Sequence, residues 1–390
     1  MSASRIYLDY NASAPLIDAA REAIVAALAL AGNPSSVHQE GRAARALVEA
    51  ARRNVAALVN ARPDHVFFTS GATEAASTLL TPHYTMGRAA MRLSRAYVGA
   101  TEHPCILSGG QFPAEQVCIV PVDADGLLDI VALRTALSVH DKSEGLPLVA
   151  VQAANNETGV IQPIADVAAI VKDAGGLLLV DAVQAAGRIP LDITNYGDYL
   201  ILSSHKIGGP KGVGAIIAHS DLVMPRALIR GGGQEKGHRG GTEALPLIAG
   251  FGAAARVAKE RLDAGGWPAD ARDMMEAGIR RIAPDAIIYG AEAPRLPNTT
   301  FFSLADMKAE TAQIAFDLAG VALSAGSACS SGKVSSSHVL AAMGHEENVG
   351  ALRVSTASEA DAGAVNRFLD VLRTIVERRD RTKVKAADAA

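Results

Sequence analysis

Apolar residues along the chain form short continuous runs, and stretches of helical spacing lie between them. From residue 38 to residue 59 apolar side chains recur at helical spacing with arginines between them, which predicts an amphipathic helix. The apolar run 66–70 follows and stops at Gly71, as expected of a buried strand. Further runs of strand length cover residues 96–100, 117–122, 148–153, 177–180 and 199–202. Because helical patterns such as 164–174 separate several of these runs, the chain predicts a mostly parallel sheet with helices on both faces.

The pattern changes after a long helical stretch at residues 245–262. Two helical patterns, strand-like segments at 286–289 and 299–304, and a helical segment at 310–319 follow. We therefore expect a large domain at residues 13–255 and a smaller α+β domain built from residues 1–12 and 256–390. A last helix is expected at 360–378, and the charges at its end are typical of a solvated helix terminus.

Composition narrows the class of protein. Of the 390 residues, 49% are hydrophobic and 20% charged, the balance of a globular protein with a large core. The 37 lysines and arginines against 41 aspartates and glutamates give a net charge of −4, which argues against a DNA-binding surface. The three cysteines form no CxxC pair, so neither a disulfide framework nor a metal site is expected.

No segment is typical of secretion or of a membrane span. Residues 1–10 lack an apolar core, and the apolar stretch 24–31 is far shorter than the roughly 20 residues that a membrane helix needs. We therefore expect a cytoplasmic protein that has no membrane partner.

Polar residues at the ends of two predicted strands suggest a ligand site. Ser70–Gly71–Ala72–Thr73–Glu74 follows a strand and opens a helix, where free N–H groups and the Thr73 hydroxyl can hold an anion. Ordinary helix capping explains such a start as well. Asp181 ends another strand, where open α/β sheets bind ligands. Its carboxylate is suited to a protonated ring nitrogen, or to capping the loop.

Three further segments carry candidate chemistry. Lys206 ends the run Ser203–Ser204–His205–Lys206 after a strand and could form a Schiff base, or be an ordinary exposed lysine. A glycine-rich stretch from Arg230 to Thr242 permits close approach of a ligand or another chain, or is a flexible connector. Cys329 lies among Ser, Ala and Gly, which suits a nucleophile on a mobile loop, whereas Cys105 and Cys118 have the apolar neighbours of inert thiols.

In this order the five segments resemble the aspartate-aminotransferase fold of pyridoxal-phosphate enzymes, also called fold type I. Within that fold the chain is similar to the class V aminotransferase-like cysteine desulfurases that have a long cysteine loop. The resemblance runs from residue 7 to about residue 353 and includes the segments 7–12, 32–36, 101–104, 155–159, 296–298 and 327–330. It implies an α/β fold with a mostly parallel seven-stranded sheet and a smaller α+β domain.

The resemblance also implies roles for individual residues. Lys206 would hold pyridoxal 5′-phosphate covalently, Asp181 would keep the ring nitrogen protonated, and Arg353 with Asn156 would bind the substrate. Lys206, Cys329 and His103 would be the catalytic residues. The implied cofactor-binding set is Gly71, Ala72, Thr73, His103, Asn156, Asp181, Gln184, Ser203, His205, Lys206 and Thr242, and no metal is implied.

The implied activity is removal of sulfur from L-cysteine, which gives L-alanine and a persulfide on Cys329. A sulfur-acceptor protein, expected to be an iron–sulfur scaffold, would then receive the sulfur. Thr242 would reach the phosphate in the neighbouring subunit, so a homodimer is implied. The alternatives are a selenocysteine lyase, another class V enzyme that uses no thiol, and a non-enzymatic sulfur-trafficking scaffold. The chain departs from the family pattern at 11–15, 75–93, 204 and 357–358, which indicates a divergent branch.

Overall fold

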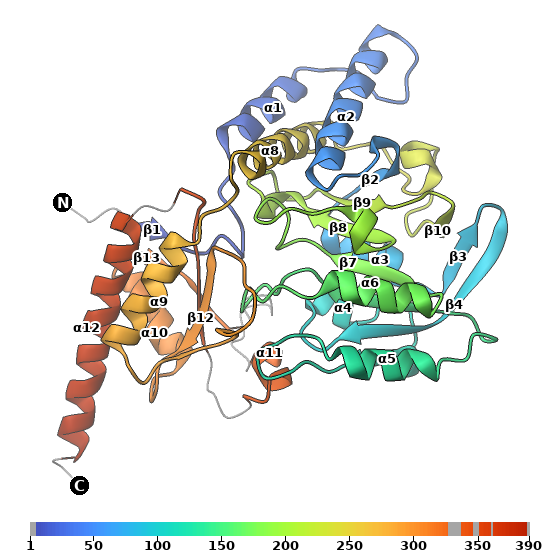
Figure 1. Ribbon diagram of the computed structural model, residues 1–390. Helices are drawn as coiled ribbons and strands as arrows, with labels where there is room; N and C mark the ends of the chain where they lie inside the picture. Colours follow the sequence, from blue (N-terminus) through green and yellow to red (C-terminus); the bar gives the residue numbers. More distant parts are fainter. Residues whose placement is uncertain (1–4, 327–336, 346–350, 360–361, 388–390) are drawn as a thin grey trace.

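The computed structural model of the chain describes residues 5–326, 337–345, 351–359 and 362–387. Figure 1 shows a large sheet flanked by helices on one side of the molecule and a smaller sheet with α9, α10 and α12 on the other. No helix among the described residues combines the length and the apolar composition that a membrane crossing requires.

The large sheet has nine strands, in the order β10-β3-β4-β6-β7-β8-β9-β2, with β5 paired to β4. Without β3 and β10, seven strands remain, and β9 is antiparallel to both of its neighbours while the other pairs are parallel. The predicted mostly parallel sheet is therefore confirmed, but it has nine strands and not seven, because the antiparallel strands β3 and β10 extend it beyond β4. The strands are β2 (Val66–Thr69), β3 (His83–Met86), β4 (Ala89–Gly99), β5 (Val117–Val120), β6 (Leu146–Gln152), β7 (Leu177–Asp181), β8 (Tyr199–Ser203), β9 (Gly214–Ala218) and β10 (Val223–Pro225).

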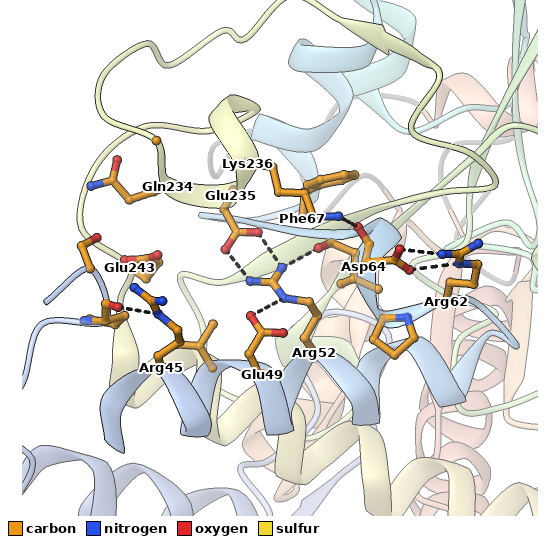
Figure 2. Close-up of a pocket in the computed structure, with 16 residues that line it drawn as sticks. Arg45, Glu49, Arg52, Arg62, Asp64, Phe67, Gln234, Glu235, Lys236 and Glu243 are labelled. Atoms are coloured by element: carbon orange, nitrogen blue, oxygen red, sulfur yellow. Dashed lines mark hydrogen bonds and ion pairs between the residues drawn. The ribbon is translucent and has the colours of Figure 1, made fainter. Parts of the chain in front are cut away.

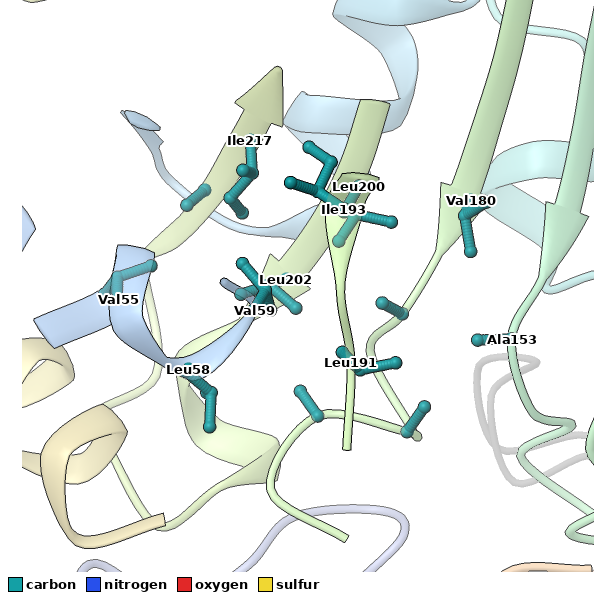
Figure 3. Close-up of a cluster of buried hydrophobic side chains, with 14 of the residues drawn as sticks. Val55, Leu58, Val59, Ala153, Val180, Leu191, Ile193, Leu200, Leu202 and Ile217 are labelled. Carbon is teal, nitrogen blue, oxygen red and sulfur yellow. The ribbon is translucent and has the colours of Figure 1, made fainter. Parts of the chain in front are cut away.

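Both faces of this sheet are buried, because successive side chains of each strand point to opposite faces. Leu200 and Leu202 of β8 pack in one cluster with residues of α2 (Gln39–Leu58), α6 (Ile164–Asp173) and α8 (Leu245–Asp263). Figure 3 shows part of that cluster. Tyr199 and Ile201 pack in another cluster, with α3 (Ala72–Leu79) and α4 (Pro104–Leu107). Burial on both faces explains why the strands are continuous apolar runs and not alternating ones.

Helices α1 (Asp18–Leu28), α2 and α8 form a layer beyond the sheet. α2 and α8 approach closely at Gly252, where an added Cβ would lie 2.5 Å from the Cα of Ala51. The glycine is therefore required for this helix–helix contact.

The smaller part has a four-stranded sheet in the order β11-β12-β15-β14. Its own apolar cluster contains Phe302, Phe316 and Phe368, and Leu8 of the N-terminal segment joins it. The N-terminal strand β1 (Ile6–Tyr7) pairs with β13 (Val321–Ala322). The remaining elements are β11 (Ile287–Ile288), β12 (Thr299–Ser303), β14 (Ser324–Ala325), β15 (Leu352–Ser355), α9 (Asp270–Ile282), α10 (Ala309–Leu318), α11 (His338–Ala342) and α12 (Ala362–Ala387). Helix α8 continues through residue 255, and the division into 13–255 and the remainder stays a prediction.

Candidate active site

The polar residues of the site follow strands that run in the same direction. β2, β4, β6, β7 and β8 end at one edge of the sheet, because β9 alone among the seven runs the opposite way. A cavity of about 470 Å³ lies at this edge, the position where open α/β sheets bind ligands. Its lining includes Asn11, Ala12, Ser70, Gly71, Ala72, Thr73, His103, Cys105, Gln152, Asn156, Asp181, Gln184, Ser203, His205, Lys206 and Lys211.

Ten of the eleven residues expected to bind the cofactor line this cavity. The eleventh, Thr242, is exposed and lies outside the lining, and its role toward a neighbouring subunit stays a prediction. Cys329 falls in 327–336, outside the described residues. The segment that follows it re-enters the described structure beside the site, where the Nε2 of His338 lies 2.9 Å from the carbonyl oxygen of Glu102.

The start of α3 offers backbone N–H groups to an anion. Its N-cap residue Gly71 supplies no side-chain cap, so the N–H groups of the first turn are left unpaired. The carboxylate of Glu74 instead accepts a hydrogen bond from the N–H of Ser70 at 2.8 Å and pairs with Arg239 at 3.1 Å, which fixes the turn. Gly214 of β9 abuts this turn, since an added Cβ there would meet the Cα of Gly71 at 2.8 Å. This cradle fits a phosphate group.

Lys206 lies in a short 3₁₀ turn, Ser204–Lys206, directly after β8. Its Nζ donates hydrogen bonds to the carbonyl oxygens of Asn11, at 2.6 Å, and Ala12, at 2.9 Å. The N-terminal segment thus holds the amine at the cavity. A half-buried lysine amine with neutral oxygen partners is suited to forming a Schiff base with an aldehyde.

Asp181 is a buried carboxyl at the end of β7. Burial raises its pKa to about 6, although the N–H of Val183, at 2.9 Å, and the charge of Lys206 act in the opposite direction. A cation in the cavity would stabilise the ionised form further. The carboxyl is therefore suited to a protonated ring nitrogen, and the donor set as a whole fits pyridoxal 5′-phosphate.

Both histidines of the cavity are neutral at physiological pH. Burial lowers the pKa of His103 to about 4, with Lys206 and His338 adding to the effect. Burial also lowers the pKa of His205 to about 4, with contributions from Lys206 and Lys211. One nitrogen of each ring can therefore accept a hydrogen bond while the other donates.

Arg353 lies behind the cavity lining and not in it. It is 1% exposed, and its guanidinium donates to Asp9 at 2.8 Å, to Ser324 at 3.1 Å and to the carbonyl oxygen of Asn156 at 3.0 Å. Its Nε has no partner among the described residues. A substrate carboxylate would have to compete with Asp9 for this arginine, whose role in substrate binding stays a prediction.

A second cavity of about 530 Å³ is lined by charged residues of α2, the turn before β2 and the glycine-rich loop. Figure 2 shows that these charges face one another. Arg52 pairs with Glu235 at 2.7 Å, and Arg62 pairs with Asp64 at 2.8 Å. The pair Arg52–Glu235 ties the glycine-rich loop to α2, and Glu235 also accepts a hydrogen bond from the N–H of Phe68 in β2 at 2.8 Å.

Sequence reasoning missed several residues of the cavity. Asn11 and Ala12 contribute carbonyl oxygens, which leave no signature in a sequence. Gln152 ends β6, and its amide donates to the carbonyl oxygen of Thr101 at 2.9 Å. Cys105 was expected in an inert apolar setting, but it lines the cavity beside His103. Its position two residues after His103 was the signal that could have identified it.

Replacing Asp181 with asparagine is expected to stabilise the cofactor-free protein at neutral pH. The carboxyl of Asp181 has an ordinary pKa of 3.8, raised in the fold to about 6. The folded state therefore holds a proton that the unfolded chain releases, and stability falls as the pH rises from about 4 to about 6. At pH 7 the variant should be more stable by roughly 3 kcal/mol, and it should bind the cofactor less tightly.

Urea unfolding of the cofactor-free protein at pH 4 and pH 7 measures this difference. The exposed Asp173 at the end of α6 provides the control variant Asp173→Asn, which should change nothing. An equal effect of Asp181→Asn at both pH values would show that the buried charge is not its cause.

Known proteins are similar to nearly the whole of this chain, both in sequence and in structure. A cysteine desulfurase of Cereibacter sphaeroides is 39% identical over 386 residues, covering 96% of each chain. An IscS-like cysteine desulfurase of Mycobacterium tuberculosis is 36% identical over 394 residues and covers 98% of this chain and 99% of its own. The crystal structure of a NifS-like protein from Rickettsia africae has a TM-score of 0.84 at 30% identity, covering 96% of this chain and 99% of that chain.

These likenesses confirm the resemblance and the fold type I architecture that the sequence predicted. The family model described as aminotransferase class-V matches residues 6–368, which span the N-terminal segment, the strands that end at the cavity and the beginning of α12. The matched residues include Lys206, Asp181 and the start of α3, which line the same cavity. The chain therefore belongs to the aminotransferase class-V family.

Proposed function

We propose that this chain is a pyridoxal-phosphate-dependent cysteine desulfurase, which takes sulfur from L-cysteine and releases L-alanine. The observation that carries the proposal is the meeting of Lys206, Asp181 and the uncapped start of α3 in one cavity. Relatives that bear the name cysteine desulfurase, at 36–39% identity over nearly the whole chain, support the choice of substrate.

Different residues would bind the phosphate, the ring nitrogen, the ring oxygen and the face of the ring. The first turn of α3 with Thr73, together with Ser203 and His205, would bind the phosphate. Asp181 would pair with the ring nitrogen, Gln184 and Asn156 would face the ring oxygen, and His103 would stack on the ring. When bound, the cofactor supplies an electron sink that stabilises negative charge at the α-carbon of the substrate amine.

The chain's own groups then bind the substrate and move its protons. The amine of Lys206 would receive the α-proton of the substrate. Arg353 and Asn156 would orient the substrate carboxylate, which requires Arg353 to exchange its contact with Asp9. Asp181 remains ionised when a cation lies beside it.

Cys329 would receive the sulfur. Its thiolate attacks the sulfur of the substrate, a sulfur–sulfur bond forms, and the bond between that sulfur and the substrate β-carbon breaks with its electron pair left on carbon. Protonation of that carbon gives the methyl group of alanine. The reaction balances as one thiol and one L-cysteine giving one persulfide and one L-alanine.

We also propose a protein acceptor for the sulfur and a homodimer as the active form. A protein acceptor, an iron–sulfur scaffold in the first instance, would take the sulfur from Cys329 in the cytoplasm. The exposed Thr242 on the glycine-rich loop would complete the phosphate site of a second copy, so the active form would be a homodimer.

A single-turnover assay of the purified protein with L-cysteine tests the proposal. We expect one alanine per active site and a mass increase of one sulfur atom on the peptide that contains Cys329. L-Selenocysteine in place of L-cysteine tests the lyase alternative, which predicts turnover of the selenium compound alone. Bound cofactor without alanine from either compound would contradict the proposal and favour a class V enzyme that uses no thiol.

A further inference from the structure

Cys105 and His103 contact each other in the wall of the cavity. The sulfur of Cys105 lies 3.0 Å from the Nδ1 of His103, and both residues line the cavity. Neither the proposed sulfur transfer nor the proposed cofactor contacts use Cys105.

The backbone decides which nitrogen of His103 carries the proton. His103 is the N-cap residue of α4, and its Nδ1 accepts a hydrogen bond from the N–H of Cys105 at 3.2 Å. A backbone N–H always donates, so Nδ1 must be the unprotonated nitrogen of the neutral ring. The proton of the neutral ring therefore lies on Nε2.

The same argument fixes the state of Cys105. A thiolate beside the lone pair of Nδ1 would be repelled, whereas a thiol can donate its hydrogen to it. Burial raises the pKa of the Cys105 thiol, and the charges of Asp181 and Glu102 raise it further, while a hydrogen bond from Thr73 acts in the opposite direction. Cys105 is therefore a protonated donor at neutral pH and a poor nucleophile.

The other nitrogen of His103 is open to the cavity. Nε2 has no hydrogen-bond partner among the described residues. It is also not one of the buried side-chain atoms that lack a partner, so it is not fully enclosed. The ring is half-buried and lines the cavity. The charged and titratable groups that act on it are Lys206, from the turn after β8, and His338, from α11.

We propose that Cys105 is a positioning residue that, through its thiol and its backbone N–H, holds His103 as the neutral Nε2–H tautomer. His103 then presents a hydrogen-bond donor, and not a lone pair, to whatever occupies the cavity. The consequence for the reaction rests on the proposed function: in a desulfurase, His103 would donate a hydrogen bond and Lys206 would be the base. Cys105 itself would carry no sulfur.

Nitrogen NMR of the purified protein, labelled with ¹⁵N-histidine, reads the tautomer directly. The chain has ten histidines, and the variant His103→Gln identifies the signals of His103 by their loss. We expect the wild-type ring to show a protonated Nε2 and an unprotonated Nδ1 at pH 7. This measurement needs no substrate and no substitution of Cys105. A protonated Nδ1 in the wild type would overturn the proposal.

Two substitutions separate the thiol from the backbone. Cys105→Ala removes the side-chain donor that stabilises the neutral ring, so the pKa of His103 should rise by about 0.7, the effect of one ordinary hydrogen bond. Cys105→Ser keeps a donor and should leave that pKa near the wild-type value of about 4. Cys118→Ala is the matched control, since Cys118 has a hydrogen-bond contact with Arg95 and, within the part of the chain that the structure describes, none with a histidine.

The outcomes distinguish this proposal from the proposed function. An unchanged pKa in Cys105→Ala, or a rise in Cys105→Ser equal to that in Cys105→Ala, would contradict a donor role. After reaction with L-cysteine, a persulfide found on Cys105 would also overturn it, because the thiol would then be a nucleophile. If the wild type shows the Nε2–H tautomer but releases no alanine, the proposed function fails while the positioning role stands.

Discussion

Replacing Lys206 with alanine should lower the rate of alanine release from L-cysteine by roughly 10³-fold, within the range seen when a positioned acid–base group is lost. The variant loses both the amine that would attach the cofactor and the group that would take the α-proton. The carbonyl oxygens of Asn11 and Ala12 lose a hydrogen-bond donor but remain beside the cavity. The protein should therefore fold and still bind the cofactor, without a covalent bond.

Borohydride reduction followed by peptide mass spectrometry checks the attachment site. The wild type should keep the cofactor on residue 206, and the variant should release it on denaturation. Lys172→Ala, at an exposed position of α6, is the matched control and should behave as the wild type. Cofactor recovered on another lysine of the wild type would refute the assignment of Lys206.

Replacing Cys329 with alanine should abolish the persulfide and lower alanine release by about 10³-fold, because no other nucleophile would be available to take the sulfur. Cofactor binding should persist, since none of the residues proposed to hold the cofactor changes. The absorbance of the bound cofactor and a single-turnover alanine assay measure the two effects separately.

Cys118→Ala again serves as the control and should retain both the persulfide and the rate. Cys329→Ser, which keeps a hydroxyl of similar size, should be as inactive as Cys329→Ala. Undiminished alanine release in Cys329→Ala would mean that Cys329 is incidental, and the lyase or a thiol-independent class V reaction would then be the better explanation.

The sequence predicted the strands of the sheet centre well, because burial on both faces makes each a continuous apolar run. There are two exceptions. β9 (Gly214–Ala218) was not predicted, although all of its residues are buried, and β4 was expected at residues 96–100 and is found at Ala89–Gly99. The first half of β4 pairs with β3 in an exposed hairpin, where polar residues are tolerated and no apolar run marks the strand. The atypical stretch 75–93 of the sequence includes most of this hairpin.

Residues of the site were predictable where they end a strand, as Asp181 and Ser203 do. Contacts between distant segments were not. Arg353 pairs with Asp9, 344 positions away in the chain, and nothing local to either residue indicates this. The prediction that Cys105 is an inert thiol with apolar neighbours agrees with its burial and its raised pKa, but its contact with the Nδ1 of His103 in the cavity wall was not predicted.

The amine of Lys206 takes two of its contacts from main-chain oxygens, and this affects how the segment can evolve. A carbonyl oxygen is the same on every residue, so substitutions at position 12 can accumulate without altering what the lysine meets. Position 11 is not free in the same way, because the side chain of Asn11 also bonds to Thr299 and to the carbonyl oxygen of Asn156. Substitution at position 12 is therefore compatible with an unchanged lysine environment, and this part of the unusual segment 11–15 can differ without a change of chemistry.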